Sequence, residues 1–146
     1  MKIGIAIREN QSDYFVHKSY VYLIKKYGFE FDYVSLNTNL YSFDAFLLPG
    51  GYDIDPAYYH QSNYASSNIS FEIDELDKKI ILFCVQNKTP LLGICRGIQS
   101  INVFLGGSLK QNIINHMDEN HFIYFNNNYI LVNSFHHQSI DRLADS

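Results

Sequence analysis

The residues best suited to covalent chemistry surround Cys95, in the run Gly93-Ile94-Cys95-Arg96-Gly97. This run joins a predicted strand (89–94) to a predicted helix (96–105), and it has the pattern of a nucleophile elbow with Cys in place of Ser. The two glycines fit that interpretation, because a Cβ at either position would collide with neighbouring backbone in so tight a turn. The N-terminus of the following helix favours the thiolate form of the cysteine. The pattern therefore favours a nucleophile over a small buried cysteine in an ordinary turn.

A second motif, Leu47-Leu48-Pro49-Gly50-Gly51, ends another predicted strand, residues 44–48. Loops at the carboxyl ends of parallel strands meet at one edge of the sheet, so we expect this loop to face Cys95. Free N–H groups of a Gly-Gly turn, together with the N–H of Arg96, can hold a developing oxyanion. An ordinary Pro-Gly turn is the alternative interpretation.

Histidines form the third feature. His136 and His137 follow a predicted strand in the run Val132–Gln138, where they could supply a base or bind substrate. His116 and His121 resemble metal ligands, but no carboxylate or cysteine set completes a site around them. We therefore expect no metal and no cofactor. Cys84 lies on the apolar face of a predicted helix and is expected to be a small core residue.

The elements that must position these motifs alternate along the chain. The hydrophobic pattern predicts a first strand at 2–7, a helix that begins at Asp13 and is capped by Gly28, and strands at 31–36 and 44–48. A loop at 52–70 precedes a helix at 71–87, and two short strands, 122–125 and 129–133, flank an Asn-rich turn. This order predicts one α/β domain, residues 1–146, with a mostly parallel central sheet.

Composition narrows the classes of partner. The 146 residues carry 11 Lys and Arg against 15 Asp and Glu, a net charge of −4, so nucleic acid is not an expected partner. The apolar runs are far shorter than the roughly 18 residues that span a bilayer. Two cysteines do not make a disulfide framework. We expect a cytoplasmic protein with free thiols and no membrane contact.

Together these motifs resemble the class I glutamine amidotransferases, and within them the γ-glutamyl hydrolase branch of cysteine peptidases (peptidase C26, which includes γ-glutamyl-γ-aminobutyrate hydrolase). The matching stretches are distributed over nearly the whole chain: Leu48–Asp53 with Asp55-Pro56 and Tyr58-Tyr59, Pro90–Gln99 with Asn102-Val103 and Leu105–Leu109, and Asn133–Gln138. The resemblance implies a flavodoxin-like three-layer domain. It also implies hydrolysis of the γ-glutamyl amide bond of a small compound, or of glutamine, through a thioester on Cys95.

The same resemblance implies roles for particular residues. The amides of Gly51 and Arg96 would form the oxyanion hole. The other residues would bind the substrate, with Gln99 helping to hold the glutamyl group and the segment Asn133–His136 lying beside its pocket: Gly50, Gln99, Asn133, Ser134, Phe135 and His136.

The chain departs from the family pattern in one respect. Family members carry the catalytic base and its partner in a His-Pro-Glu motif, whereas none of the three prolines here (Pro49, Pro56 and Pro90) follows a histidine. We therefore expect a C-terminally truncated domain that lacks about 40–50 residues, at usual element lengths.

Three other functions stay open at this stage. The chain could be an amidotransferase subunit that supplies ammonia to a partner synthase, or a catalytically inactive, truncated binding domain that associates with itself or a partner. A flavodoxin-like nucleotide binder is less favoured, because no Gly-x-Gly-x-x-Gly phosphate loop occurs in the sequence.

Overall fold

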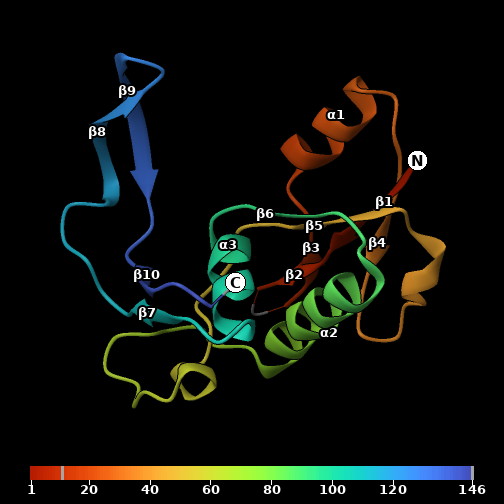
Figure 1. Ribbon diagram of the computed structural model, residues 1–146, viewed down its shortest axis with the longest axis horizontal. Helices are drawn as coiled ribbons and strands as arrows, with labels where there is room; N and C mark the ends of the chain where they lie inside the picture. Colours follow the sequence, from red (N-terminus) through yellow and green to blue (C-terminus); the bar gives the residue numbers. More distant parts are fainter. Residues whose placement is uncertain (11, 146) are drawn as a thin grey trace.

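The computed structural model describes residues 1–10 and 12–145, and its centre is a four-stranded parallel sheet (Figure 1). The strands lie in the order β4-β1-β5-β6, which is 2-1-3-4 by their sequence within the sheet, the order of flavodoxin-like folds. Their bounds are β1 Lys2–Ala6, β4 Glu30–Val34, β5 Ala45–Leu48 and β6 Leu91–Gly93. The expected α/β class with a mostly parallel sheet is confirmed.

Helices cover both faces of this sheet, and the strand residues alternate between them. Phe46 and Leu48 of β5 pack with α2 (Phe71–Asn87) in the largest buried cluster, whereas Leu47 packs with Ile24 of α1 (Lys18–Lys26) on the opposite face. Figure 1 shows α1 on one side of the sheet, with α2 and α3 (Arg96–Phe104) on the other. The period of two along a strand thus produces the predicted three layers.

Helix α2 has the predicted bounds because its ends carry strong local signals. The Ser70 hydroxyl accepts a hydrogen bond from the N–H of Ile73 at the N-terminus, and Lys88 adopts a left-handed conformation at the C-terminus. The apolar positions Ile73, Leu76 and Ile80 are buried as the periodicity predicts. Two aspartates of the same helix, Asp74 and Asp77, are also fully buried, which the hydrophobic pattern does not predict.

The prediction that a helix begins at Asp13 is wrong. Residues Arg8–Glu9 (β2) and Tyr14–Phe15 (β3) form a short antiparallel hairpin, and α1 begins at Lys18. The Asn10 side chain accepts a hydrogen bond from the N–H of Asp13 at 2.8 Å, so a side-chain-stabilised turn replaces the first helical turn. Gly28, with φ +74°, ends the helix as expected.

Smaller corrections concern the ends of other elements. Compared with the predicted strand 31–36, β4 begins one residue earlier and ends two residues earlier, and the predicted strand 89–94 is shortened to β6. The predicted loop 52–70 contains a 3-10 turn, Pro56–Tyr59 (η2). A second 3-10 turn, Leu40–Ser42 (η1), precedes β5. Gly106, with φ +99°, follows α3 close to the expected end.

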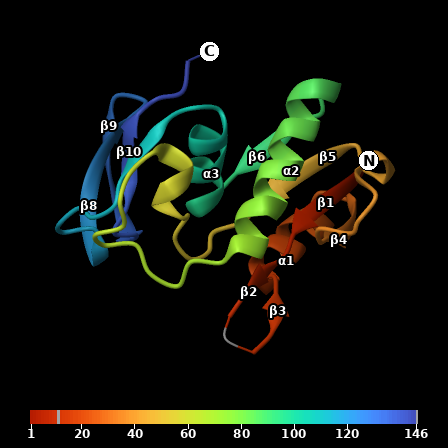
Figure 2. The ribbon, with the colours of Figure 1, turned by 90° about the horizontal axis from the view of Figure 1, so that it is seen from below.

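The C-terminal third adds strands outside the central sheet. Two short strands that the sequence analysis missed, β7 (Ser108–Lys110) and β10 (Ser139–Arg142), pair antiparallel. Between them, β8 (Met117–Phe125) and β9 (Asn128–Phe135) form a hairpin longer than predicted. Its turn has positive φ at both Asn126 and Asn127, as a two-residue hairpin turn requires. Both ribbon views place this hairpin at the opposite end of the molecule from the N-terminus and β4 (Figure 2).

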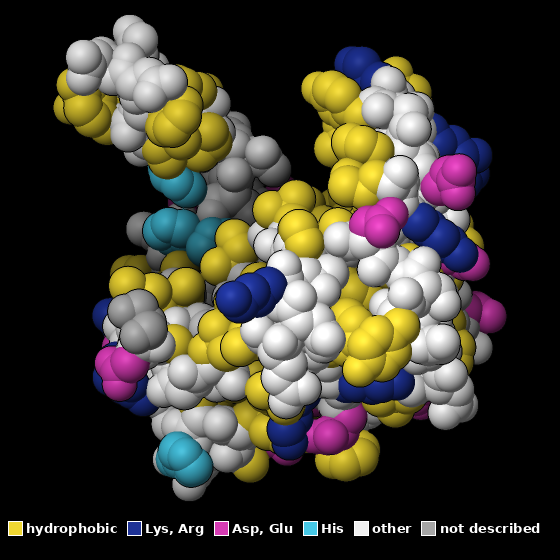
Figure 3. Space-filling model, turned by 45° about the vertical axis from the view of Figure 1, so that its right-hand side comes forward, with side chains coloured by type: hydrophobic (Ala, Val, Ile, Leu, Met, Phe, Trp, Pro, Cys, Tyr) yellow, Lys and Arg dark blue, Asp and Glu magenta, His cyan; other side chains and the backbone are white. Residues whose placement is uncertain are grey.

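The hairpin and α1 expose apolar side chains. Figure 3 shows hydrophobic side chains on the hairpin and on the second projecting part of the molecule, which lies across a hollow from the hairpin. The exposed residues include Phe122, Tyr124, Phe125, Tyr129 and Leu131 of the hairpin, and Tyr22, Leu23 and Tyr27 at α1. In addition, Leu92 of β6 is 60% exposed beside an apolar groove of about 230 Å³. Among the described residues, no helix combines the length and apolarity needed to cross a membrane.

We expect this chain to self-associate in solution, because exposed apolar patches and unpaired strand edges favour association. Light scattering coupled to size-exclusion chromatography should give a mass that rises with protein concentration. The double variant Leu92→Lys, Phe122→Lys should lower that mass toward the monomer, whereas the exposed polar control Gln86→Lys should not. A concentration-independent monomer for the unmodified chain would contradict the prediction.

Candidate active site

Cys95 lies at the carboxyl edge of the sheet, between β6 and α3. It is the N-cap residue of α3, with φ 53° and ψ −111°, and its side chain is exposed. A non-glycine residue with positive φ outside a turn is strained, and such strain gathers at functional sites. The strand–Cys–helix geometry is that of a nucleophile elbow, and it presents the sulfur at the helix N-terminus.

The glycines around Cys95 are required by backbone packing. A Cβ on Gly97 would lie 2.1 Å from the carbonyl oxygen of Leu48, and a Cβ on Gly93 would lie 2.6 Å from the backbone of Gly97. Both distances are far below the van der Waals contact distance of a Cβ atom. Strand β5, the elbow and the first turn of α3 therefore touch backbone to backbone.

The loop after β5 lies directly beside the cysteine. A Cβ built on Gly50 would lie 3.4 Å from the Cys95 Cβ and 3.8 Å from its Sγ. The N–H of Gly50 donates a long hydrogen bond, 3.4 Å, to the hydroxyl of Tyr20. The expectation that the Pro49–Gly51 loop faces Cys95 therefore agrees with the structure.

A pocket of about 560 Å³ opens above Cys95, with walls from the β2–β3 hairpin, the start of α1 and the base of the β8–β9 hairpin. This volume is within the range of small-molecule sites. Its wall is largely aromatic and apolar away from the cysteine: Phe15, Tyr20, Tyr52, Met117 and Phe135.

Two histidines line this pocket with different partners. The Nε2 of His137 lies 3.0 and 3.1 Å from the two carboxylate oxygens of Asp53, in the loop after β5. The Nδ1 of His136 lies 2.9 Å from the carbonyl oxygen of Gln138, and its ring packs against that of His116, which in turn packs against His121. Histidine side chains accordingly gather at the base of the hairpin (Figure 3). The His137–Asp53 contact joins the hairpin segment to the sheet edge.

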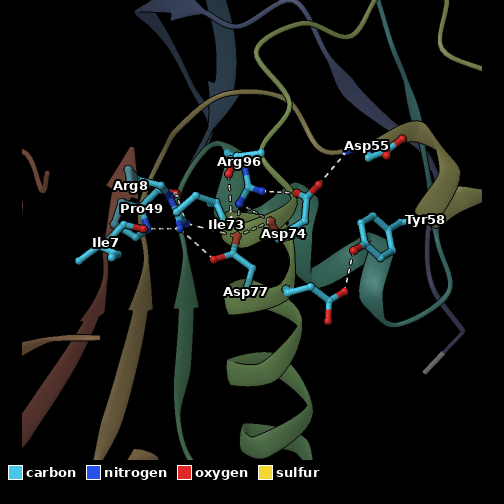
Figure 4. A network of polar contacts seen from close by, with 12 residues as sticks. Ile7, Arg8, Pro49, Asp55, Tyr58, Ile73, Asp74, Asp77 and Arg96 are labelled. Atoms are coloured by element: carbon cyan, nitrogen blue, oxygen red, sulfur yellow. Dashed lines mark hydrogen bonds and ion pairs between the residues drawn. The ribbon is translucent and has the colours of Figure 1, made fainter. Parts of the chain in front are cut away.

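Beneath the pocket, four buried charged side chains form one cluster (Figure 4). Asp77 of α2 accepts hydrogen bonds from Arg8 at 2.9 Å, from Arg96 and from the Ser100 hydroxyl at 2.7 Å. Arg96 also donates to Asp74 at 2.5 Å. Each of these four charged side chains is at most 2% exposed. Two positive and two negative charges therefore balance inside the protein.

The environment of the cluster shifts two of its pKa values in opposite directions from their ordinary values. Burial raises the pKa of Asp74 to about 6, although Arg96 and the N–H of Asp55 oppose that shift. Burial also lowers the pKa of Arg8, while its contact with Asp77 favours the charged form. Both shifts follow from the cost of charge away from water.

Six of the nine site residues named from the sequence line the pocket: Cys95, Gly50, Gly51, Gln99, Phe135 and His136. The Gln99 amide donates to the carbonyl oxygen of Gln138 at 3.2 Å, which places it under the His136–Gln138 segment. The other three do not line the pocket. Arg96 directs its side chain into the buried cluster, Ser134 is buried in β9, and Asn133 is exposed on that strand.

Sequence reasoning named His137 as a possible base or substrate ligand but did not foresee its contact with Asp53, which spans 84 residues of sequence and has no local signal. It missed several other pocket residues. Tyr20 lies in the apolar pattern of α1, and such positions usually face the core. Glu9 and Phe15 enter the pocket through the β2–β3 hairpin, whereas the sequence predicted a helix that begins at Asp13 and includes Phe15.

Comparison with known proteins assigns this chain to a family. The Peptidase C26 family model matches residues 10–128, more than half of the chain. In overall structure the chain resembles a glutamine amidotransferase from Thermotoga maritima with a TM-score of 0.66, over 97% of this chain and 63% of that one. At 17% identity this likeness concerns the fold alone.

Two curated relatives are similar in sequence. A glutamine amidotransferase-like protein of Lactococcus lactis subsp. cremoris, the YvdE homologue, is 32% identical over 124 residues, covering 69% of this chain and 65% of that protein. The gamma-glutamyl-CDP-amidate hydrolase of Campylobacter jejuni is 32% identical over 111 residues, covering 67% of this chain and 54% of that protein. The chain thus spans between about half and two thirds of the length of these two relatives.

We expect Gly97→Ala to destabilise the protein by at least about 3 kcal/mol, the upper end for overpacking, because the group it meets is rigid backbone. Gly28→Ala is the matched control. Its position has positive φ but open space around a new Cβ, so only the left-handed strain of about 1–2 kcal/mol applies. Urea denaturation of both variants measures the difference, and equal losses would contradict the backbone contact at the elbow.

We also expect Cys95 to react with iodoacetamide much faster than Cys84. Cys84 is 4% exposed, and burial raises the pKa of its thiol to about 11, so little thiolate is present at pH 8. Peptide mass spectrometry over a time course separates the two sites. Equal rates in the folded protein would argue against the exposed elbow, whereas unfolding in urea should make the two rates converge.

Proposed function

This chain belongs to the Peptidase C26 family, and we propose that it cleaves the γ-glutamyl amide bond of a small γ-glutamyl compound through a thioester on Cys95. The observation that carries this proposal is the exposed, strained Cys95 at the helix N-terminus, facing a glycine loop in a pocket of small-molecule size. The similarity to a gamma-glutamyl-CDP-amidate hydrolase supports the same reaction type.

In the proposed first step, the Cys95 thiolate attacks the γ-carbonyl carbon and a C–S bond forms. The carbonyl oxygen takes the negative charge, and the amides of Gly51 and Arg96 stabilise it. Collapse of this intermediate breaks the C–N bond, and the leaving amine takes up a proton from solvent. Water then attacks the thioester carbonyl and passes a proton to solvent, and the C–S bond breaks, which releases glutamate and restores the thiolate.

The residues that line the pocket suggest which of them contact the glutamyl half of the substrate and which contact the other half. Gln99 lies close to Cys95 on the first turn of α3 and is proposed to hold the glutamyl group, with Gly50 beneath it. Phe15, Tyr52 and Phe135 leave an aromatic wall for the group attached to the amide nitrogen. This room beyond the glutamyl moiety favours a substituted γ-glutamyl amide over glutamine.

Glutamine hydrolysis that supplies ammonia to a synthase is the second candidate, because the Lactococcus relative is glutamine amidotransferase-like. The two candidates differ in their response to substrate. A γ-glutamyl amide with a bulky amine should be used in preference to glutamine by the hydrolase, whereas glutamine and a partner synthase should be required by the amidotransferase.

We expect L-γ-glutamyl-p-nitroanilide to acylate Cys95, with release of up to one equivalent of p-nitroaniline. Intact-protein mass spectrometry should detect the γ-glutamyl adduct on the unmodified chain and on Cys84→Ser, and should find none on Cys95→Ser. The Cys84 variant is the matched control because it also removes a thiol. An adduct that forms equally without Cys95 would refute the proposed nucleophile.

For a protein of residues 1–146 we further expect steady turnover to be negligible after this burst, since no histidine in the sequence is followed by Pro-Glu. Loss of a catalytic base typically costs about 10⁴–10⁶ in rate. Sustained release of p-nitroaniline that disappears in His136→Ala or His137→Ala would contradict this expectation and identify the base within the pocket.

A further inference from the structure

We propose that Arg8 is a positioning residue for the oxyanion hole: it fixes the orientation of the Pro49–Gly50 peptide and the placement of Gly51 in the pocket that Cys95 lines. This inference rests on the proposed function for its catalytic meaning. Its structural part, that one arginine side chain sets the conformation of the glycine loop, stands independently.

Arg8 holds the loop through a single carbonyl oxygen. Its Nη2 and Nε donate to the carbonyl oxygen of Pro49 at 2.9 and 3.3 Å. The planar guanidinium presents these two donors in a fixed fork, so the contact restrains the direction of the carbonyl as well as its position. Figure 4 shows Arg8 with its guanidinium directed at Pro49 on one side and at Asp77 on the other.

The direction of this carbonyl determines where the next N–H points. The Pro49–Gly50 peptide is trans, and in a trans peptide the C=O and N–H point in opposite directions. With the Pro49 oxygen turned down toward Arg8, the N–H of Gly50 is turned away from Arg8 and toward Tyr20 in the pocket wall. A flip of this peptide would break both Arg8 contacts and the Tyr20 contact. Arg8 therefore restrains the backbone that leads into Gly51, whose N–H is the proposed oxyanion donor.

Arg8 also supports the following residue from below. A Cβ on Gly51 would lie 2.9 Å from the Arg8 Cδ and 3.1 Å from the Arg96 Cδ, so both side chains form the floor under Gly51. Arg96 is the residue whose main-chain N–H is the other proposed oxyanion donor. Because Arg8 and Arg96 share the Asp77 carboxylate, the two halves of the proposed oxyanion hole are joined through one buried group.

The main test variant is Arg8→Met with Asp77→Asn, which removes one charge of each sign and leaves Arg96 paired with Asp74. Arg8→Lys keeps the charge beside Asp77 but replaces the fork with a point donor. Lys79→Met is the matched control, since Lys79 also donates to two carbonyl oxygens, those of Leu36 and Thr38, in a loop that does not line the pocket.

Two reactions of Cys95 are compared in each variant. Acylation by γ-glutamyl-p-nitroanilide develops an oxyanion, whereas alkylation by iodoacetamide does not. We expect the double variant to lose about 10²–10³ in acylation rate, the usual cost of one oxyanion donor, with alkylation nearly unchanged. Arg8→Lys should show a smaller loss of acylation and Lys79→Met none. If the acylation and alkylation rates fell together, Arg8 would have only a structural role, and the proposal would be overturned.

Spectra of ¹⁵N-glycine-labelled protein supply a readout that does not depend on activity. The amide signals of Gly50 and Gly51 should move in the Arg8 variants, while those of Gly28 and Gly106, which lie outside the pocket, should stay in place. If the unmodified chain is not acylated at all, the proposed function fails and these spectra alone decide the positioning role. Unchanged Gly50 and Gly51 signals would overturn it in either case.

Discussion

Asp77 is the group on which the candidate active site of this protein depends. It is fully buried in the middle of α2, and its carboxylate receives hydrogen bonds from Arg8 after β1, from Arg96 after the elbow and from Ser100 of α3. A lone carboxylate in this position would be expensive to bury, and breaking a buried pair typically costs about 3–5 kcal/mol. The Asp77 carboxylate and the two arginines must therefore be buried together. Their contacts bring the ends of β1 and β6 against α2.

Backbone packing supplies the second restraint, and it acts at a shorter range than charge. The contact of Gly97 with the Leu48 carbonyl brings α3 against the end of β5, closer than any side chain would permit. Arg8 then holds the next carbonyl, that of Pro49. Two consecutive carbonyl groups at the end of β5 thus have defined partners: that of Leu48 contacts the elbow at Gly97, and that of Pro49 accepts hydrogen bonds from Arg8. The glycine loop leaves the sheet in one direction, toward Cys95.

The parts of this arrangement that sequence could predict are those with local signals. Helix α2 has a serine N-cap and an apolar period, and the glycines around Cys95 mark the elbow. The Asn10 turn misled the prediction for α1, because a side-chain-to-backbone hydrogen bond competes with a helical pattern that is otherwise good. Strands β7 and β10 are three and four residues long and pair across about 30 residues, so nothing local distinguishes them from loops. The buried Asp74 and Asp77 look like an exposed charged face until their arginines are placed.

The pocket combines a floor and a wall that come from different parts of the chain. Its floor is the sheet edge, fixed by the backbone contacts and the charge cluster. The opposite wall, from Phe135 to Gln138, is joined to the body by polar contacts that reach distant segments: His137 with Asp53, Gln138 with Ser66, and the Gln99 amide with the Gln138 carbonyl. The proposed bond-forming step needs its hydrogen-bond donors held within a fraction of an ångström, and these donors lie on the floor. The wall supplies a separate surface for the group attached to the amide nitrogen of the proposed substrate. These two demands of the proposed reaction therefore fall on different elements, which the contact of Gln99 with the Gln138 carbonyl joins beside Cys95.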